Sequence, residues 1–456
     1  MTGILLFLSL ASGQAVAQNS GLTLKQAVEG ALDASHGVKS ADAARDAAKA
    51  AASQAGHMRL PILSYDSAFT RGNDPVYVFG TLLRQKQFTA SDFDLNRLNS
   101  PDARSNFSNS LQLELPLFTG FRISHYQKLS DTAVRQADSM AIYARQGTAM
   151  EVVQKYLLSA LKAQLAAIAS DAVASSGAEL AVADRLKEKG LVLGSDYYAA
   201  QSLLGSMKAA ASSFSKEAAA SAASLSVLMG LPANRAAVPA PLARHEYLLP
   251  EEASLLDSLT GRGDVAAAEL GVRSARIVRD MESDSLWPQL GAFARVQTDT
   301  RSFFSNPIRE MAGVGLSFPL GDFTRSDRVA RREAEHRQAG EAAQQLKQNA
   351  AAQLAEYRRN YESALDALPL AEGARADAER SLELFRPLFR QGRQSVLDVA
   401  RAEYALMSAR ASCAELVFKI HSYYAALLFA SGRLGASAVE ELSIAVSGGK
   451  DESARK

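Results

Sequence analysis

The chain carries the same turn pattern twice, about two hundred residues apart. Residues 190–196 read Gly-Leu-Val-Leu-Gly-Ser-Asp and residues 392–398 read Gly-Arg-Gln-Ser-Val-Leu-Asp, so the first Gly and the last Asp recur at an offset of 202. Gly230 and Gly432 keep the same offset. A repeat this long exceeds the roughly 20 to 50 residues that are typical of solenoids. The sequence therefore predicts a tandem duplication, in which two similar halves build one pseudo-symmetric structure.

Charge and cysteine content exclude several classes of protein. The 456 residues have a formal net charge of +1, and 50 basic residues are dispersed among 49 acidic ones. We expect no nucleic-acid partner, because such binding requires a clustered basic surface. The single Cys413 excludes a disulfide framework within the chain and a multi-cysteine zinc site.

The first 17 residues have the composition of an export signal. Residues 4–10 form an apolar core, and the small residues 15–17 fit a cleavage site, so we expect cleavage after Ala17. Beyond residue 18 we find no apolar run of the roughly 18 residues that a membrane-spanning helix needs. The exported chain is therefore predicted to have no helical membrane anchor.

Two segments of nearly seventy residues, 122–189 and 326–391, have few helix breakers and are rich in Ala, Leu, Glu, Lys, Arg and Gln. At 1.5 Å per residue, each predicted helix is about 100 Å long. In the first, Val153, Leu157 and Leu161 lie four residues apart, as one stripe of a helix–helix seam requires. Shorter helices are predicted to flank the long ones, at residues 23–57, 196–229, 265–285 and 398–430.

Between these helices the hydrophobic period changes from 3.6 to 2. Leu111, Leu113 and Leu115 alternate with polar residues, and Val314 and Leu316 do the same in the second half. This alternation is typical of strands with one apolar face. We predict four strands, at about 62–71, 109–118, 289–298 and 312–320. Because a membrane barrel needs at least about eight strands, four strands in an exported chain require oligomerisation to close one.

These patterns divide the chain into five parts. A signal peptide (1–17) is followed by a first repeat (18–232), an inter-repeat linker (233–260) and a second repeat (261–433). The tail, 434–456, is expected to be flexible. The fold class is mainly α with a small β part, each half being helix, β-hairpin, long helix, tight turn and helix.

From about residue 22 to residue 432, the chain resembles the TolC-type outer-membrane efflux proteins. The resemblance implies a homotrimer that forms a 12-stranded β-barrel continuous with a 12-helix tunnel. It also implies a passive exit duct in the outer membrane of a Gram-negative bacterium, for efflux or type I secretion. The implied partners are outer-membrane lipid, a periplasmic adaptor and, through the adaptor, an inner-membrane pump. The resemblance is carried by both Gly-to-Asp turns and by the segments Leu22-Thr23-Leu24-Lys25-Gln26-Ala27, Leu113-Glu114-Leu115-Pro116-Leu117-Phe118 with Gly120, and Leu228-Met229-Gly230-Leu231-Pro232.

The two Gly-to-Asp turns resemble the periplasmic tips of that family, where the adaptor docks. An alternative is that these residues only cap helices, since Gly is the usual helix C-cap and Ser395 with Asp398 fits a capping box. A turn with capped helices can also be a docking tip, so the two interpretations are compatible. The resemblance implies docking residues at Gly190, Leu191, Val192, Asp196, Gly392, Arg393, Gln394 and Ser395.

The family closes its periplasmic end partly with rings of aspartate just after the second tip. Asp398 matches the first ring position, but Arg401 stands at the second. The resemblance therefore implies a gate at Asp398 and Arg401, in which the Arg neutralises or pairs with the Asp.

The first predicted hairpin is longer than the second. Pro288 follows Pro61 by 227 residues, but Pro319 follows Pro116 by only 203, which leaves 24 additional residues between positions 71 and 109. The segment contains several aromatic residues, including Tyr77, and we expect it to fold over the mouth of the duct or to pack on a neighbouring copy. The alternative is a partly disordered surface loop.

No pattern in the sequence indicates catalysis, a cofactor or a metal site. The six histidines show no i, i+4 pairing, and no set of acid, base and nucleophile emerges. The remaining alternatives to a duct are a periplasmic coiled-coil adaptor and a soluble scaffold. An adaptor has one helical hairpin instead of two equivalent halves, and a scaffold has no use for an export signal or apolar strands.

Overall fold

The computed structural model describes residues 22–234, 238–301 and 307–448, and the predicted signal peptide lies outside them. Contacts between residues divide the chain into two compact units. Unit 1 contains residues up to Asp42, Ser139–Val265 and the chain from Leu346 onward. Unit 2 contains Ala43–Asp138 and Ala266–Gln345. Each unit is thus built from both halves of the duplicated sequence.

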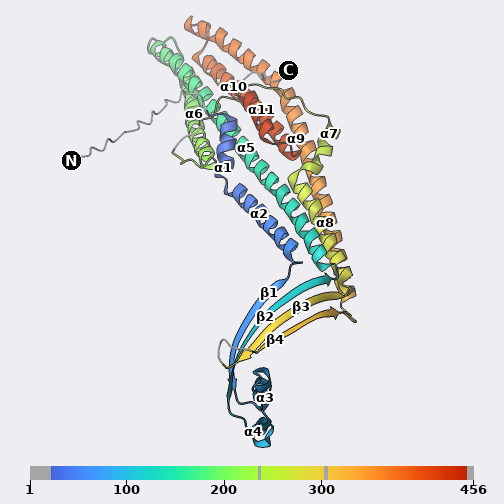
Figure 1. Ribbon diagram of the computed structural model, residues 1–456. Coiled ribbons are helices and arrows are strands. Elements are labelled where there is room, and N and C mark those ends of the chain that lie inside the picture. Colours follow the sequence, from blue (N-terminus) through green and yellow to red (C-terminus); the bar gives the residue numbers. More distant parts are fainter. Residues whose placement is uncertain (1–21, 235–237, 302–306, 449–456) are drawn as a thin grey trace, which may run out of the picture. The chain divides into compact units, whose positions relative to one another are not determined.

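The two long helices form as predicted. Helix α5 spans Arg122–Glu188 (67 residues) and α9 spans Arg325–Arg390 (66 residues), each within one residue of the predicted bounds (Figure 1). The predicted 23–57 helix is divided at Ser35 into two helices. The shorter helices of the two halves are α1 (Leu24–Ala34), α2 (His36–His57), α6 (Gly194–Leu228), α8 (Gly263–Ser283) and α10 (Val396–Ala430).

Helix α5 corrects one expectation. Within the described residues, it is long and apolar enough by length and composition to cross a membrane, whereas the sequence analysis predicted no such segment. Its apolar stripe is already occupied by protein, because Val153, Leu157 and Leu161 lie in the hydrophobic core of unit 1. The apolar composition of α5 is therefore explained by its packing as a core helix.

Unit 2 contains one four-stranded antiparallel sheet in the order β1-β2-β3-β4 (Figure 1). Each predicted strand exists, and the strands extend beyond or shift from their predicted bounds by a few residues. The two hairpins are joined through β2 and β3, where Leu111 pairs with Val296. The strand bounds are Ile62–Gly72 for β1, Arg104–Thr119 for β2, Gln289–Thr300 for β3 and Ile308–Ser317 for β4.

The insertion in the first hairpin is folded. Residues 73–103, called here the helical insertion, contain α3 (Pro75–Arg84), the 3-10 turn η1 (Ala90–Phe93) and α4 (Leu95–Asn99). Asp74 caps α3 by accepting a hydrogen bond from the N–H of Tyr77 at 2.8 Å. Its aromatic side chains meet edge to face, with centroids 4.9 Å apart for Phe79 and Phe88 and 5.0 Å apart for Phe88 and Phe93.

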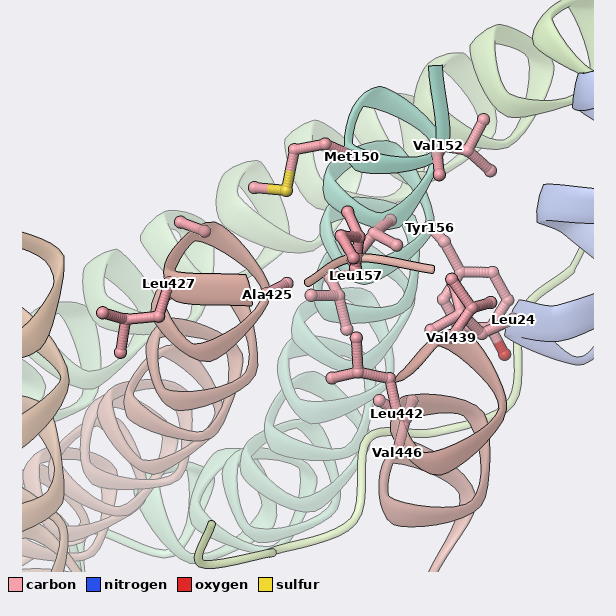
Figure 2. Close-up of a cluster of buried hydrophobic side chains, with 14 of the residues drawn as sticks. Leu24, Met150, Val152, Tyr156, Leu157, Ala425, Leu427, Val439, Leu442 and Val446 are labelled. Carbon is pink, nitrogen blue, oxygen red and sulfur yellow. The ribbon is translucent and has the colours of Figure 1, made fainter. Parts of the chain in front are cut away.

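The core of unit 1 joins distant parts of the chain. Figure 2 shows Leu24 of α1 and Tyr156 of α5 close to Leu442, which belongs to the last helix. That helix, α11 (Ala436–Ser447), is buried along one side. The prediction of a flexible tail was therefore wrong for residues 436–447, because apolar residues spaced three and four apart give this segment a face that packs in the core.

Part of the predicted inter-repeat linker forms regular structure. It contains α7 (Glu252–Ser258) and the 3-10 turn η2 (Leu259–Gly261). Tyr247 stacks on Tyr424 of α10, with ring centroids 3.7 Å apart, and its hydroxyl lies 2.6 Å from Nδ1 of His421. Nε2 of His421 lies 2.8 Å from the carbonyl oxygen of Ala243, so this nitrogen carries the proton and Nδ1 accepts. Burial lowers the pKa of His421 to about 4, which keeps the ring neutral near pH 7.

Candidate functional site: a two-faced sheet and paired helical tips

The sheet of unit 2 has two chemically different faces. Alternation places Ser64, Asp66, Ser110 and Gln112 on one side, and the registers align this side with Arg295 of β3. On this polar face Arg295 Nε donates a hydrogen bond to Gln112 Oε1 at 2.7 Å. The polar face is thus a surface suited to water.

The opposite face is apolar and open. The registers align Leu63 with Leu113 and Ala294, and Tyr65 with Leu111 and Val296. Large hydrophobic side chains on this face are exposed, among them Leu63, Tyr65, Phe69, Leu111, Leu113, Val314 and Leu316. An exposed apolar surface of this extent indicates contact with lipid or with another protein surface.

An aromatic group continues the apolar face at the end of β2. Phe118 and Phe121 meet edge to face at 5.2 Å, and Phe121 and Trp287 meet in the same way at 5.3 Å. Gly120 has a φ of +59°, and a Cβ there would lie 3.0 Å from the Trp287 carbonyl oxygen. Aromatic groups of this kind are typical of the boundary between membrane and water in β-barrels.

The outer strands of the sheet each pair on one side only. Among the described residues, β1 pairs with β2 and β4 pairs with β3. Unpaired strand edges are templates for pairing with another chain. The sheet therefore has two free edges through which further copies can join it.

Both predicted tips are tight helix ends of the same type. Gly190 has a φ of +75° and Gly392 a φ of +71°, a conformation that favours glycine. At the first tip the N–H of Leu191 donates to the Leu186 carbonyl at 2.9 Å, and at the second the N–H of Arg393 donates to the Leu388 carbonyl at 2.9 Å. These bonds define the Schellman motif. The capping interpretation is thus confirmed for both glycines.

The structure brings the two tips together. The Ser395 hydroxyl donates a hydrogen bond to Asp196 Oδ2 at 2.6 Å. Around this bond lies a cavity of about 580 Å³. Of the predicted docking residues, Leu191 is highly exposed, and the cavity is lined by Leu191, Val192, Asp196, Gly392, Arg393, Gln394 and Ser395.

The capping box predicted at Ser395 is replaced by a different arrangement. Ser395 Oγ accepts from the N–H of Leu397 at 3.1 Å, and Asp398 Oδ2 accepts from Gln394 Nε2 at 2.6 Å. Asp398 also lies 3.8 Å from Nη1 of Arg401, one turn along α10. The predicted pairing of Asp398 with Arg401 is therefore present within one copy.

A charge network with two buried carboxylates was missed by the sequence analysis. Arg386 of α9 contacts Glu403 of α10, and Arg390 Nη2 lies 2.7 Å from Glu179 Oε1 of α5. Glu179 and Glu403 are both buried. The sequence feature that could have indicated this network is the four-residue spacing of Arg386 and Arg390, which places both on one face of the helix. It did not stand out because charged residues are frequent throughout this helix.

Comparison with known proteins gives the family. The family model described as outer membrane efflux protein matches residues 27–231 and 255–433. A search of curated proteins gave no match.

Solved structures share the fold at low sequence identity. The outer membrane protein VceC from Vibrio cholerae is 18% identical, with a TM-score of 0.75 over 90% of this chain and 96% of that chain. The CmeC outer membrane channel of Campylobacter jejuni is 14% identical, with a TM-score of 0.78 over 95% and 90%. The open state of the MtrE outer membrane channel of Neisseria gonorrhoeae is 14% identical, with a TM-score of 0.76 over 91% and 90%. Since the family model covers most of both duplicated halves, the chain belongs to the outer membrane efflux protein family.

Proposed function

We propose that the chain is one subunit of a trimeric exit duct that carries substrates passively through the outer membrane. As a family member it is an outer-membrane efflux channel of a Gram-negative bacterium. In this assembly three copies form a 12-stranded barrel and a 12-helix periplasmic tunnel. The adaptor and scaffold alternatives receive no support from the family model or from the channels with this fold.

The observation that carries the assembly is the two-faced sheet with two unpaired edges. One copy of four strands is too small for a membrane barrel, whereas three copies give twelve strands. Closure pairs β4 of one copy with β1 of the next, which satisfies both rows of free backbone groups. It also turns the apolar face toward lipid and the polar face toward a water-filled lumen.

The tips and the gate are assigned as part of the same proposal. The exposed residues around Leu191 and Arg393 contact the helical hairpin of a periplasmic adaptor, through which the duct reaches an inner-membrane pump. Asp398 and Arg401 lie at the tunnel entrance, near the threefold axis. Support for both assignments comes from the paired tip geometry and from the match of the family model over these segments.

The test is the mass and conductance of the purified full chain. It should require detergent for extraction from the outer-membrane fraction, and light scattering should give three times the subunit mass after subtraction of detergent. Insertion into planar lipid bilayers should then produce discrete conductance steps. A monodisperse monomer that is soluble without detergent would overturn the proposal.

A further inference from the structure

The helical insertion is attached to the polar face of the sheet. The hydroxyl of Tyr77 in α3 lies 2.8 Å from Thr70 Oγ1, and Arg104 Nε donates to Gln85 Oε1, just after α3, at 3.1 Å. Arg309 Nη1 donates to the carbonyl oxygen of Arg84 at 3.0 Å. Thr70, Arg104 and Arg309 all belong to the polar face by strand alternation.

A buried polar cluster fixes this attachment. Asp299 is fully buried at 0% exposure, and its Oδ1 accepts from Asn106 Nδ2 at 2.6 Å. Asn106 Oδ1 in turn accepts from Gln85 Nε2 at 3.0 Å, and Arg309 forms an ion pair with Asp299. A buried carboxylate is tolerated only when charge and hydrogen bonds satisfy it, so separating these groups is costly. The insertion is therefore a fixed part of the sheet.

The insertion also carries large apolar side chains that are exposed. Val76 is 80% exposed, Leu95 74% and Phe93 66%. Asp74 and Asp94 cap the two helices that carry Val76 and Leu95, so the positions of these side chains are set by regular structure. Three large apolar side chains held in place and exposed to this degree indicate a protein contact.

The dimensions of a twelve-stranded barrel indicate which protein surface the insertion contacts. Strands about 4.8 Å apart and tilted by about 40° give a circumference of roughly 75 Å and a backbone diameter of roughly 24 Å. A helix with its side chains is about 10 Å across, so three helices side by side occupy a circle of roughly 22 Å. Three insertions attached to the inner wall therefore reach the axis and one another.

We propose that the helical insertions of three copies meet on the threefold axis and close the extracellular mouth of the duct. Val76, Phe93 and Leu95 of one copy face the insertion of a second copy of this chain. The inference rests on the proposed trimeric duct. It gives the duct a second closure, in addition to the gate at Asp398.

Disulfide trapping tests the contact between copies. Leu95→Cys should give covalently linked copies on mild oxidation in the outer membrane, and the native Cys413 is buried and contributes little background. Leu63→Cys is the matched control, because this exposed residue lies on the apolar face. Equivalent outward positions in three copies are roughly 25 Å apart, far beyond disulfide reach. Equal trapping in the two variants, or none in either, would overturn the proposal.

Labelling from outside the cell tests the closure. Ser110→Cys places a thiol on the polar face, where a bulky membrane-impermeant maleimide should react slowly in intact cells. Gly72 pairs with Arg104, so residues 73–103 can be replaced by a two-residue Asn-Gly turn that continues the hairpin. We expect at least a tenfold faster reaction in this deletion variant. Equal rates in the two proteins would overturn the closure.

The same labelling separates failure of the closure from failure of the duct. No reaction in the deletion variant, with its trimer intact, would mean that the polar face does not line a lumen, and both proposals would fall. If the deletion variant does not assemble, Gln85→Ala combined with Tyr77→Phe loosens the insertion while keeping every strand. That variant should accelerate labelling of Ser110→Cys several-fold, and an unchanged rate would count against the closure.

Discussion

Ser395 and Asp196 are 199 residues apart in the chain, yet the hydroxyl of one donates a 2.6 Å hydrogen bond to the carboxylate of the other. Each residue stands directly after the tight turn of its own half. The bond therefore joins the two duplicated tips to each other within a single copy. The proposed docking site is therefore one paired surface.

This bond predicts coupled motion of the tips. Ser395→Ala removes the donor to Asp196 and also the cap of α10, which is worth about 1 kcal/mol. Hydrogen exchange should become faster in both tips, at residues 186–196 and 388–398. Asp196→Asn keeps an acceptor oxygen and should change exchange much less than Asp196→Ala. Faster exchange confined to the second tip would show that Ser395 acts only as a cap.

The gate assignment predicts the ion preference of the channel. Three Asp398 carboxylates near one axis favour cations and bind divalent ions, so Asp398→Asn should weaken cation preference and block by divalent ions. Arg401 is exposed and lies 3.8 Å from Asp398, and exposed ion pairs of this kind contribute at most about 1 kcal/mol to stability. Because Arg401→Asp adds a second acidic ring, it should strengthen both the cation preference and the block by divalent ions.

Single-channel recording measures these changes. Asp46→Asn, at an exposed carboxylate of α2, serves as the control for a general loss of negative charge. Asp398→Asn keeps an acceptor oxygen for Gln394 Nε2, so the stability of this variant should change little. Unchanged selectivity and ion block in both gate variants would leave Asp398 with a structural role alone.

The buried His421 predicts a loss of stability in mild acid. Its pKa is about 4 in the folded chain, against about 6.5 when unfolded, so the unfolded state binds more protons between these values. Stability should therefore fall as pH decreases from about 6.5 to 4, by roughly 3 kcal/mol for this group, with no contribution above pH 7.

Substitution isolates that contribution. His421→Gln cannot titrate, so the difference in unfolding midpoint between pH 7 and pH 4.5 should be smaller in this variant than in the unmodified protein. Both are measured in the same detergent, because other groups also titrate in this range. The same pH dependence in the two proteins would contradict a neutral, buried His421.

The two-faced sheet predicts opposite outcomes for adjacent substitutions. Leu111 points to the apolar face and Ser110 to the polar face, where it lies opposite Asp66. An Arg facing lipid near the middle of a membrane costs about 2 to 4 kcal/mol. Leu111→Arg should reduce the amount of assembled trimer in the outer membrane, and Ser110→Arg should leave it near normal. Equal loss in both variants, judged by heat-modifiable electrophoresis, would contradict the assignment of the faces.

Local patterns in the sequence were sufficient for most of the fold. The 3.6 and 2.0 periods place the long helices within one residue and the strands within a few residues, because each period follows from backbone geometry. The tip glycines were predictable for a similar reason, since a left-handed helix end favours Gly at that position. The last helix was predictable in principle, because Val439, Leu442 and Val446 are spaced three and four apart.

Contacts between distant residues were not predictable in this way. Nothing near Ser395 in the sequence indicates Asp196, and nothing near Arg390 indicates Glu179. The length of the helical insertion follows from the unequal offsets of the two halves, but the face to which it attaches depends on Asp299, almost two hundred residues beyond it. Such pairings depend on how helices and strands pack after they form.

Helix α11 determines when the core of unit 1 can form during export. Helix α11 packs against α1, where Lys25 Nζ lies 2.8 Å from Glu440 Oε1, and Leu442 and Val446 belong to the same core as Leu24. During export the N-terminal residues leave the translocation pore first, and Leu24 cannot complete its core contacts until residues 436–447 follow. The core of unit 1 therefore cannot close on a partly secreted chain, and a chain truncated before residue 436 should remain a substrate for periplasmic chaperones and proteases.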